Sequence, residues 1–460
     1  MVIKAGNDVK AGIWYTVGNF VNRGIAFLST PIFTRLLTKE DYGEFSNFTA
    51  WAEMLMVFTS LDMYASINRA YQDYEEDFDT YMSTISWLSI SFSAFCYLAV
   101  WLFRGWAVEL FGMSLSYINM LFIYLIFAPA SQLFLTWQRI RGKYKTAIFV
   151  SLGSALLSLG LSLLMVLTFQ NKVLGRLVGY VLPVVMINAV LYGFFLSRGK
   201  HFIREKAKYA LALAVPLIPH HLSGSILAKS DQFMIRRYCG SADLAVYSFA
   251  YDCSLVVSIL STSINQAYVP WLYRKLKENE FDEIDRQARR LLILFLLLVL
   301  GIMLLVPEMA YILGSGKYTD SVYMIPVIMG GYCLRFLYTY YVNIELFCKK
   351  SLAISLATIF AAAINVGLNL LWIPQYGYQA AAFTTIIGFA VLYIVHYNVV
   401  KRTQYGKLYH NKTLFFILLL FLAIIWGIQY LYLVNIWRYV AVSIYLLIFC
   451  YILHRNYSCK

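Results

Sequence analysis

The stretch TPIFTRLLTKEDYGEFSNF (residues 30–48) contains five charged side chains, four of which lie between two long apolar runs. These four are Arg35, Lys39, Glu40 and Asp41. A helix needs about 20 mostly apolar residues to span a bilayer, and the runs on both sides are long enough. The stretch therefore predicts two membrane-spanning helices joined by a tight polar turn.

The composition of the chain favours a membrane protein. Its 460 residues are 60% hydrophobic and only 13% charged, whereas soluble domains carry about 25% charged residues. We expect the net charge of +14 to mark cytoplasmic loops, not a nucleic-acid site. The seven cysteines form no CxxC pair, so neither a disulfide framework nor a metal site is predicted.

Apolar runs of this length recur along the whole chain, and they predict an all-α integral membrane protein of about fourteen transmembrane helices. The expected spans lie near residues 11–36, 43–68, 81–103, 114–138, 146–169, 173–197, 209–237, 243–271, 290–313, 321–347, 351–373, 378–400, 413–434 and 436–454.

Basic residues predict the orientation of these spans. With both termini in the cytoplasm, the inner segments hold 25 Lys and Arg residues and the outer ones nine, as the positive-inside rule requires. The acidic loop 72–81 is also placed inside, and acidic residues count little in this rule. We therefore expect a multi-pass protein of the bacterial cytoplasmic membrane with both termini inside.

The opening stretch has a degenerate copy, QFMIRRYCGSADLAVYSF (residues 232–249). A shift of 202 residues aligns Arg35 with Arg237 and Asp41 with Asp243. Six helices per copy is an even number, so both copies cross the membrane in the same direction, which is the parallel-repeat plan of some transporters. We expect an N-lobe at 1–208, a C-lobe at 209–400 and a C-terminal helix pair at 401–460.

Polar side chains form matching stripes on the first helix of each repeat. Asn19 and Arg23 share one helical face, and His221, Ser225 and Lys229 share another. Cations inside a membrane need water or an anion, so Arg23 and Lys229 are expected to face a cavity. For Asn19 and Ser225, hydrogen bonding between helices is an equally good interpretation.

Further ionisable residues lie inside the expected spans. Asp62 either pairs with Arg69 or Arg23 or has a functional role. Asp231 either takes part in ion or proton coupling or neutralises an arginine of another helix. Arg335 and Glu345 both fall in the tenth span. Pro216 and Pro219 predict a bend before His221.

Signatures of the common hydrolases and nucleotide-binding enzymes do not occur in the sequence. It has no HExxH, no GxSxG and no GxGxxG after a strand. LGSGKYTD (313–320) lacks the first glycine of a phosphate loop, and Tyr318 occupies the position of its magnesium ligand. We therefore expect no catalytic residues, no enzyme activity and no cofactor.

Residues 12–48 and 227–251 carry a resemblance to a known family. Pro31, Arg35, Asp41 and Gly43 fit the pattern P-I-[FY]-x-R-x-L followed by [DE]-[DEF]-[YF]-G-x-[YF]. This pattern is similar to that of the polysaccharide and O-antigen flippases of the multidrug/oligosaccharidyl-lipid/polysaccharide exporter superfamily. In the second stretch Lys229, Asp231 and Ile235 match, but Gln232 replaces a commonly basic residue.

The resemblance implies a transporter of lipopolysaccharide, capsule or exopolysaccharide precursors. Such relatives move undecaprenyl-pyrophosphate-linked oligosaccharide from the inner to the outer leaflet by alternating access, driven by an ion or proton gradient. They act beside a polysaccharide polymerase and a chain-length regulator. For this chain, Arg23, Lys229, Arg335, Asn19 and His221 are then the candidates for substrate binding. The candidates for ion coupling are Asp231, Asp62 and Glu345.

Three other functions fit parts of the pattern. A multidrug or cation antiporter of the same superfamily usually has twelve helices, and this chain has an additional pair. A membrane polysaccharide polymerase carries a long outer catalytic loop, and no predicted loop here is that long. A scaffold of a glycan-assembly complex would need no charges in the membrane.

Overall fold

A computed structural model describes residues 5–458. The chain divides into two compact units, Met1–Ala245 and Val246–Lys460. The helices of the first unit are α1 (Ala5–Leu36), α2 (Lys39–Thr59), η1 (Met63–Ser66), α3 (Ile67–Asp73), α4 (Phe78–Leu102), α5 (Arg104–Phe111), α6 (Leu115–Phe127), α7 (Pro129–Ile140), α8 (Tyr144–Thr168), α9 (Lys172–Gly199), α10 (Arg204–Ala214), η2 (Val215–Leu217) and α11 (Ile218–Tyr238).

The second unit takes over within α12 (Ser241–Glu278). It continues with α13 (Phe281–Leu304), α14 (Val306–Gly314), η3 (Thr319–Ser321), α15 (Met324–Phe347), α16 (Ser351–Tyr376), α17 (Gln379–Lys401), α18 (Asn411–Leu431) and α19 (Asn435–Ser458). The boundary between the predicted lobes, near residue 208, stays a prediction.

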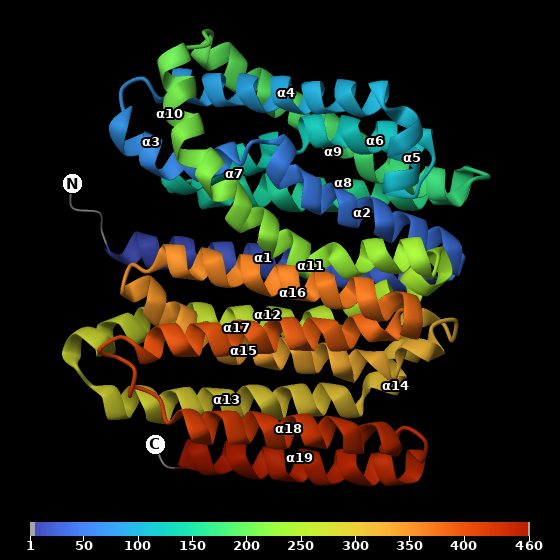
Figure 1. The fold of residues 1–460 in the computed structure, drawn as a ribbon, viewed down its shortest axis with the longest axis vertical. Coiled ribbons are helices and arrows are strands. Elements are labelled where there is room, and N and C mark those ends of the chain that lie inside the picture. The colour runs from blue at the N-terminus through green and yellow to red at the C-terminus, as the bar shows by residue number, and fades with distance from the viewer. Residues whose placement is uncertain (1–4, 459–460) are drawn as a thin grey trace. The chain divides into compact units, whose positions relative to one another are not determined.

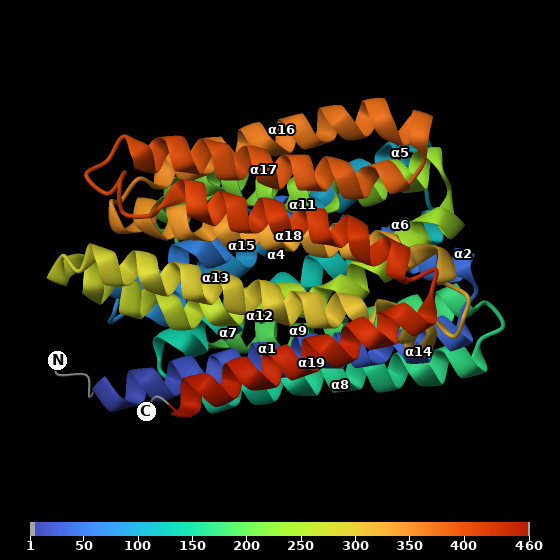
Figure 2. The same cartoon turned by 90° about the horizontal axis from the view of Figure 1, so that it is seen from below.

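The predicted all-α membrane architecture is confirmed. Eleven helical segments of the described chain are long and apolar enough to cross a membrane. With α1, α2 and α19 they account for every one of the fourteen spans expected from the sequence. In unit 1, α8 packs along α9, and α4 and α1 pack against this pair (Figure 1). In unit 2, α17 packs against both α15 and α16 (Figure 2).

The charged turn that interrupts the first hairpin is a helix cap. Thr38 accepts a hydrogen bond from the backbone N–H of Asp41 at 3.1 Å, and the Asp41 carboxylate accepts one from the N–H of Thr38 at 3.2 Å. This reciprocal capping box satisfies two of the N–H groups that the first turn of a helix leaves unpaired. Thr38 and Asp41 therefore cap the start of α2 within the polar turn.

Gly43 allows a close approach of two backbones. A Cβ at this position would lie 1.9 Å from the carbonyl oxygen of Ser241, so no larger residue fits without movement. The neighbouring Glu44 accepts hydrogen bonds from Arg236 and from the hydroxyl of Ser241, both at 2.6 Å. The family-like motif thus joins the start of α2 to the end of α11.

The second span is broken, which corrects the expectation of one continuous helix over 43–68. After Thr59 the chain leaves the helix, and Leu61 and Asp62 adopt φ values of +54° and +53°. Such left-handed geometry costs a residue with a side chain roughly 1–3 kcal/mol. Asp62 and Arg69 consequently do not share one helical face, and Arg69 pairs instead with Asp73 at 3.0 Å.

The acidic loop 72–81 is paired with basic residues of two other loops of unit 1. Asp79 accepts hydrogen bonds from Arg141 at 3.4 Å and from Arg198 at 2.9 Å. Asp77 forms an ion pair with Lys206. These contacts bring together the loops near 70–80, 139–145 and 198–208. All three loops are predicted to lie on one side of the membrane, and these contacts are consistent with that prediction.

We expect Asp77→Ala to lower the melting temperature of the detergent-purified protein more than Asp79→Ala. The Lys206 side chain is 6% exposed and would lose its carboxylate, whereas Arg141 and Arg198 are 27% and 45% exposed and can reach water. The hydrogen bond from Lys206 holds the pKa of Asp77 below its usual range.

This contribution to stability is present above the unfolded pKa of about 4 and is lost as the pH falls through the lowered pKa. Melting curves of wild type and both variants at neutral and acidic pH check the prediction. The deficit of Asp77→Ala should shrink in acid. Equal melting temperatures for the two variants at pH 7 would contradict it.

Candidate functional site

The break after α2 directs the carboxylate of Asp62 toward α11. Its backbone N–H donates to the carbonyl of Val57 at 3.1 Å and to the hydroxyl of Ser60 at 3.3 Å, which holds the loop in place. The Asp62 side chain is fully buried. A buried carboxylate requires a partner, because the membrane interior does not solvate its charge.

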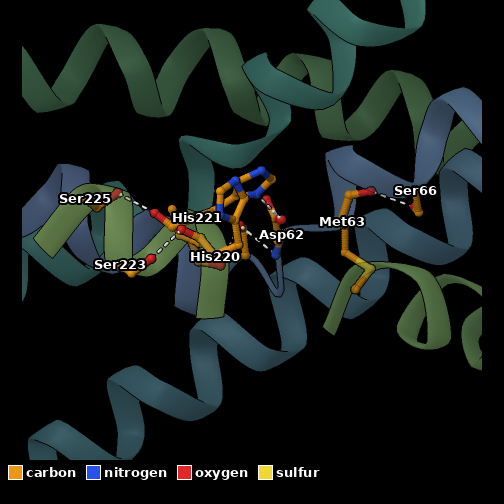
Figure 3. A network of polar contacts seen from close by, with 9 residues as sticks. Asp62, Met63, Ser66, His220, His221, Ser223 and Ser225 are labelled. Carbon is orange, nitrogen blue, oxygen red and sulfur yellow. Dashed lines mark hydrogen bonds and ion pairs between the residues drawn. The ribbon is translucent and has the colours of Figure 1, made fainter. Parts of the chain in front are cut away.

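His221 is that partner. Its Nδ1 lies 2.6 Å from Oδ2 of Asp62, although 159 residues separate the two in sequence. The other carboxylate oxygen, Oδ1, is buried with no hydrogen-bond partner. The ring of Tyr64 stacks on the ring of His221, with centroids 6.2 Å apart. Figure 3 shows the rings of His220 and His221 next to Asp62.

The proline pair explains why two histidines can face Asp62. The chain before α11 forms the short 3-10 helix η2, and Pro216 and Pro219 lie in η2 and in the first turn of α11. The predicted bend before His221 is confirmed. Proline removes a backbone hydrogen bond and bends the helix axis. The side chains of His220 and His221 can therefore point in directions that a straight helix would not allow. The Nδ1 atom of His220 is buried without a partner.

A pocket of about 300 Å³ lies beside this pair. Ser60, Met63 and Tyr64 line it from the Asp62 loop, and Ser225 lines it from α11. Glu53 contributes a carboxylate, which lies 3.1 Å from the ammonium of Lys229. Within unit 1, the pocket thus lies next to the loop that carries Asp62, and the Glu53 carboxylate that pairs with Lys229 lines it.

Lys229 lies on α11 as predicted, but it is already paired. Its side chain is 15% exposed, and that of Glu53 is 61% exposed. An anionic ligand of Lys229 would have to compete with the Glu53 carboxylate. Two residues further along α11, Asp231 is buried and accepts a hydrogen bond from the backbone N–H of Gln232 at 2.8 Å.

Other predicted residues lie elsewhere. Asn19 and Arg23 belong to α1, but their side chains lie outside the described residues. Arg335 and Glu345 lie on α15 in unit 2. Within the described chain Arg335 forms no ion pair, whereas Glu345 pairs with His396 at 3.0 Å.

The Glu345–His396 pair repeats the chemistry of Asp62–His221 in the second unit. Both side chains are buried, at 0% and 1% exposure, and Oε2 of Glu345 has no partner. The ring of Tyr338 stacks on His396, with centroids 5.7 Å apart. His396 was not predicted, since an isolated histidine in an apolar run does not reveal its partner.

Comparison with known proteins identifies the family. Residues 9–276 match the family described as polysaccharide biosynthesis protein. The chain belongs to this family. An uncharacterized membrane protein of Haemophilus influenzae is 23% identical over 418 residues, which cover 86% of this chain and 98% of that protein.

Solved structures of transporters share the fold of this polysaccharide biosynthesis family member. The lipid II flippase MurJ in an inward closed conformation superposes with a TM-score of 0.77 at 14% identity, over 96% of this chain and 99% of that one. An inward-facing multidrug resistance MATE transporter of the MOP superfamily gives 0.61 at 16% identity, over 83% and 96%. The predicted membership of a polysaccharide family is confirmed by the family match, and the likeness in structure shows that this chain has the same fold as the two transporters.

Proposed function

We propose that the protein is a flippase that moves an undecaprenyl-pyrophosphate-linked oligosaccharide from the inner to the outer leaflet of a bacterial cytoplasmic membrane. The observation that carries this proposal is the extent of the likeness to the lipid II flippase. It covers 96% of this chain, against 83% for the multidrug transporter. Together with membership of the polysaccharide biosynthesis family, this favours a lipid-linked glycan over a drug.

The chemistry required for such a substrate matches residues inside the spans. A pyrophosphate needs fixed cations in a low-dielectric surrounding. Arg23, Lys229 and Arg335 are our candidates for this role, and Asn19 and His221 are candidates for hydrogen bonding to the head group. A polysaccharide polymerase and a chain-length regulator would use the product on the far side of the membrane.

Coupling to an ion or proton gradient is assigned to buried carboxylates, and Asp62 is the foremost of them. Oδ2 of Asp62 is bound to His221, while Oδ1 is buried without a partner. An unsatisfied buried acceptor of this kind costs about 1–3 kcal/mol. Uptake of a proton or a cation would relieve that cost. A gradient drives movement only when the two conformations bind the ion with different affinity.

Reconstituted vesicles test the function directly. Undecaprenyl-pyrophosphate carrying a radiolabelled trisaccharide is placed in the inner leaflet, and its appearance outside is followed by the action of a membrane-impermeant glycosidase. We expect appearance to be faster than in protein-free vesicles by at least tenfold. A rate equal to that of protein-free vesicles, together with efflux of a cationic dye, would favour the multidrug alternative.

We expect Lys229→Gln to lower the apparent affinity of the protein for the lipid and Glu53→Gln not to lower it. Removing Lys229 deletes a cation that the pyrophosphate would contact, and charge-assisted bonds contribute roughly 1.5–3 kcal/mol, so the apparent affinity for the lipid should fall about tenfold or more. Removing the Glu53 carboxylate frees Lys229 from its partner and should leave affinity unchanged or higher. If both variants lose affinity equally, the pair is structural and Lys229 does not bind the substrate.

A further inference from the structure

A second pocket in unit 1, of about 430 Å³, contains an arginine. It is lined by residues of α1, α6, α8 and α9, and its volume falls in the range of small-molecule sites. Ser151, Ser154 and Ser158 all line it, because spacings of three and four place them on one face of α8. Arg176 of α9 lines the same space.

Two aromatic rings fix the guanidinium of Arg176. Its Cζ lies 3.4 Å from the ring centroid of Phe33 and 4.3 Å from that of Phe45. Cation–π contacts of this kind stabilise a desolvated cation by about 2 kcal/mol, but they leave its N–H donors unsatisfied. Nε of Arg176 is indeed buried without a hydrogen-bond partner.

Among the residues that the structure describes, no carboxylate pairs with the guanidinium of Arg176. Within residues 5–458 as described, Arg176 forms no ion pair, in contrast to Arg198 of the same helix, which pairs with Asp79. The pocket holds a second unsatisfied atom. Nδ2 of Asn22 donates to Ser151 at 2.6 Å, and Oδ1 of Asn22 is buried without a partner. A cation in a membrane-spanning segment usually faces a counter-charge or water.

We propose that this pocket binds a single oxyanion that carries neighbouring hydroxyl groups. The planar fork of an arginine matches a carboxylate or a phosphate with two parallel hydrogen bonds. The serine face of α8 and the amide of Asn22 supply partners for hydroxyl groups. Tyr124 and Tyr180, whose hydroxyls lie 3.4 Å apart, provide ring faces and further donors.

Two molecules in a bacterial membrane have this chemistry. One is an acidic sugar of the transported oligosaccharide, an assignment that rests on the proposed function. The other is the glycerol phosphate head group of an anionic lipid. In both cases the site is the same, and only the source of the anion differs.

Calorimetric titration of the protein in phosphatidylcholine nanodiscs tests the site without transport. Glucuronic acid is the probe, and glucose is the neutral control of the same shape. We expect glucuronic acid to bind and glucose not to bind at the same concentration. Arg176→Gln should weaken binding of glucuronic acid at least tenfold, while Arg198→Gln, a change on the same helix outside the pocket, should leave it unchanged.

Two further arms complete the test. The double variant Ser154→Ala with Ser158→Ala keeps Arg176 and its two aromatic contacts, so it remains informative even where Arg176→Gln does not fold. It should weaken binding of glucuronic acid several-fold. Phosphatidylglycerol in the nanodisc should abolish binding of glucuronic acid where the natural ligand is a lipid head group, and should leave it intact where the ligand is an acidic sugar.

The proposal is overturned when glucuronic acid does not bind, or when it binds equally well to wild type and to the variants of the pocket. Because binding is measured with a soluble probe, this result is independent of the flipping experiment. A protein that flips its lipid and ignores glucuronic acid would keep the proposed function and lose this site.

Discussion

Asp62→Asn should abolish gradient-driven flipping while leaving passive exchange of the lipid between leaflets. Asparagine keeps the shape of the side chain but carries no negative charge, so it removes the carboxylate that contacts His221 at 2.6 Å and that an ion would bind. The two conformations then no longer differ in their affinity for the ion, so a gradient cannot drive the movement between them. In reconstituted vesicles the acceleration by an imposed proton or sodium gradient is expected to fall at least tenfold.

Asp79→Asn is the matched control for this experiment. Asp79 is also a carboxylate of unit 1, but it is 33% exposed and pairs with two arginines in a loop. Its variant should respond to the gradient as wild type does. Gradient-driven flipping by Asp62→Asn at the wild-type rate would remove Asp62 from the coupling mechanism and leave Asp231 as the remaining candidate in unit 1.

The membrane architecture was predictable, because the bilayer demands about 20 apolar residues from every crossing helix. The apolar runs are therefore visible without any knowledge of contacts. The polar turn was visible because charged side chains interrupt two apolar runs there, whereas the capping box of Thr38 and Asp41 was not predicted.

The break at Leu61 and Asp62 was not predictable from local signals. No glycine or proline marks it, and two residues with side chains adopt positive φ values there. The interactions that pay for this geometry come from elsewhere in the chain, including His221, which lies 159 residues away. Asp62 and His221 were both predicted as site residues, but Asp62 was assigned to ion coupling and His221 to substrate binding.

Arg176 shows the same limit. In the sequence it counts as one of nine basic residues on the outer side. Its seat between Phe33 and Phe45 depends on the packing of α1 and α2 near α9. The serine face of α8 could have been recognised from the sequence, since Ser151, Ser154 and Ser158 follow helical spacing.

His396→Ala should strongly destabilise the protein, because it leaves a wholly buried carboxylate without its partner. Glu345 is 0% exposed, and its second oxygen is already unsatisfied. Breaking such a pair costs about 3–5 kcal/mol, which corresponds to a fall in melting temperature of about 10 °C for a unit of this size. Thermal unfolding of the detergent-purified variant measures this.

His410→Ala is the matched control in the same unit. Its partner Asp285 keeps a second contact, with Arg289 at 2.8 Å, and the His410 side chain is 67% exposed. The melting temperature of this variant should therefore fall much less. If the melting temperature falls equally in the two histidine variants, the unpaired carboxylate of Glu345 is not the cause of the destabilisation.

Glu345→Gln separates stability from coupling at this second pair. In its presence His396→Ala leaves no buried charge, so the double variant should be more stable than His396→Ala alone. The loss in the double variant minus the losses in the two single variants measures the interaction between the side chains. Additive losses would show that they do not interact. Glu345 was predicted to take part in ion coupling. Its partner His396 is 1% exposed, whereas the His221 partner of Asp62 is 33% exposed, and this closed environment favours a structural role for Glu345. Gradient-driven flipping by Glu345→Gln decides between these roles: a wild-type response supports the structural one, and loss of the response at unchanged melting temperature supports coupling.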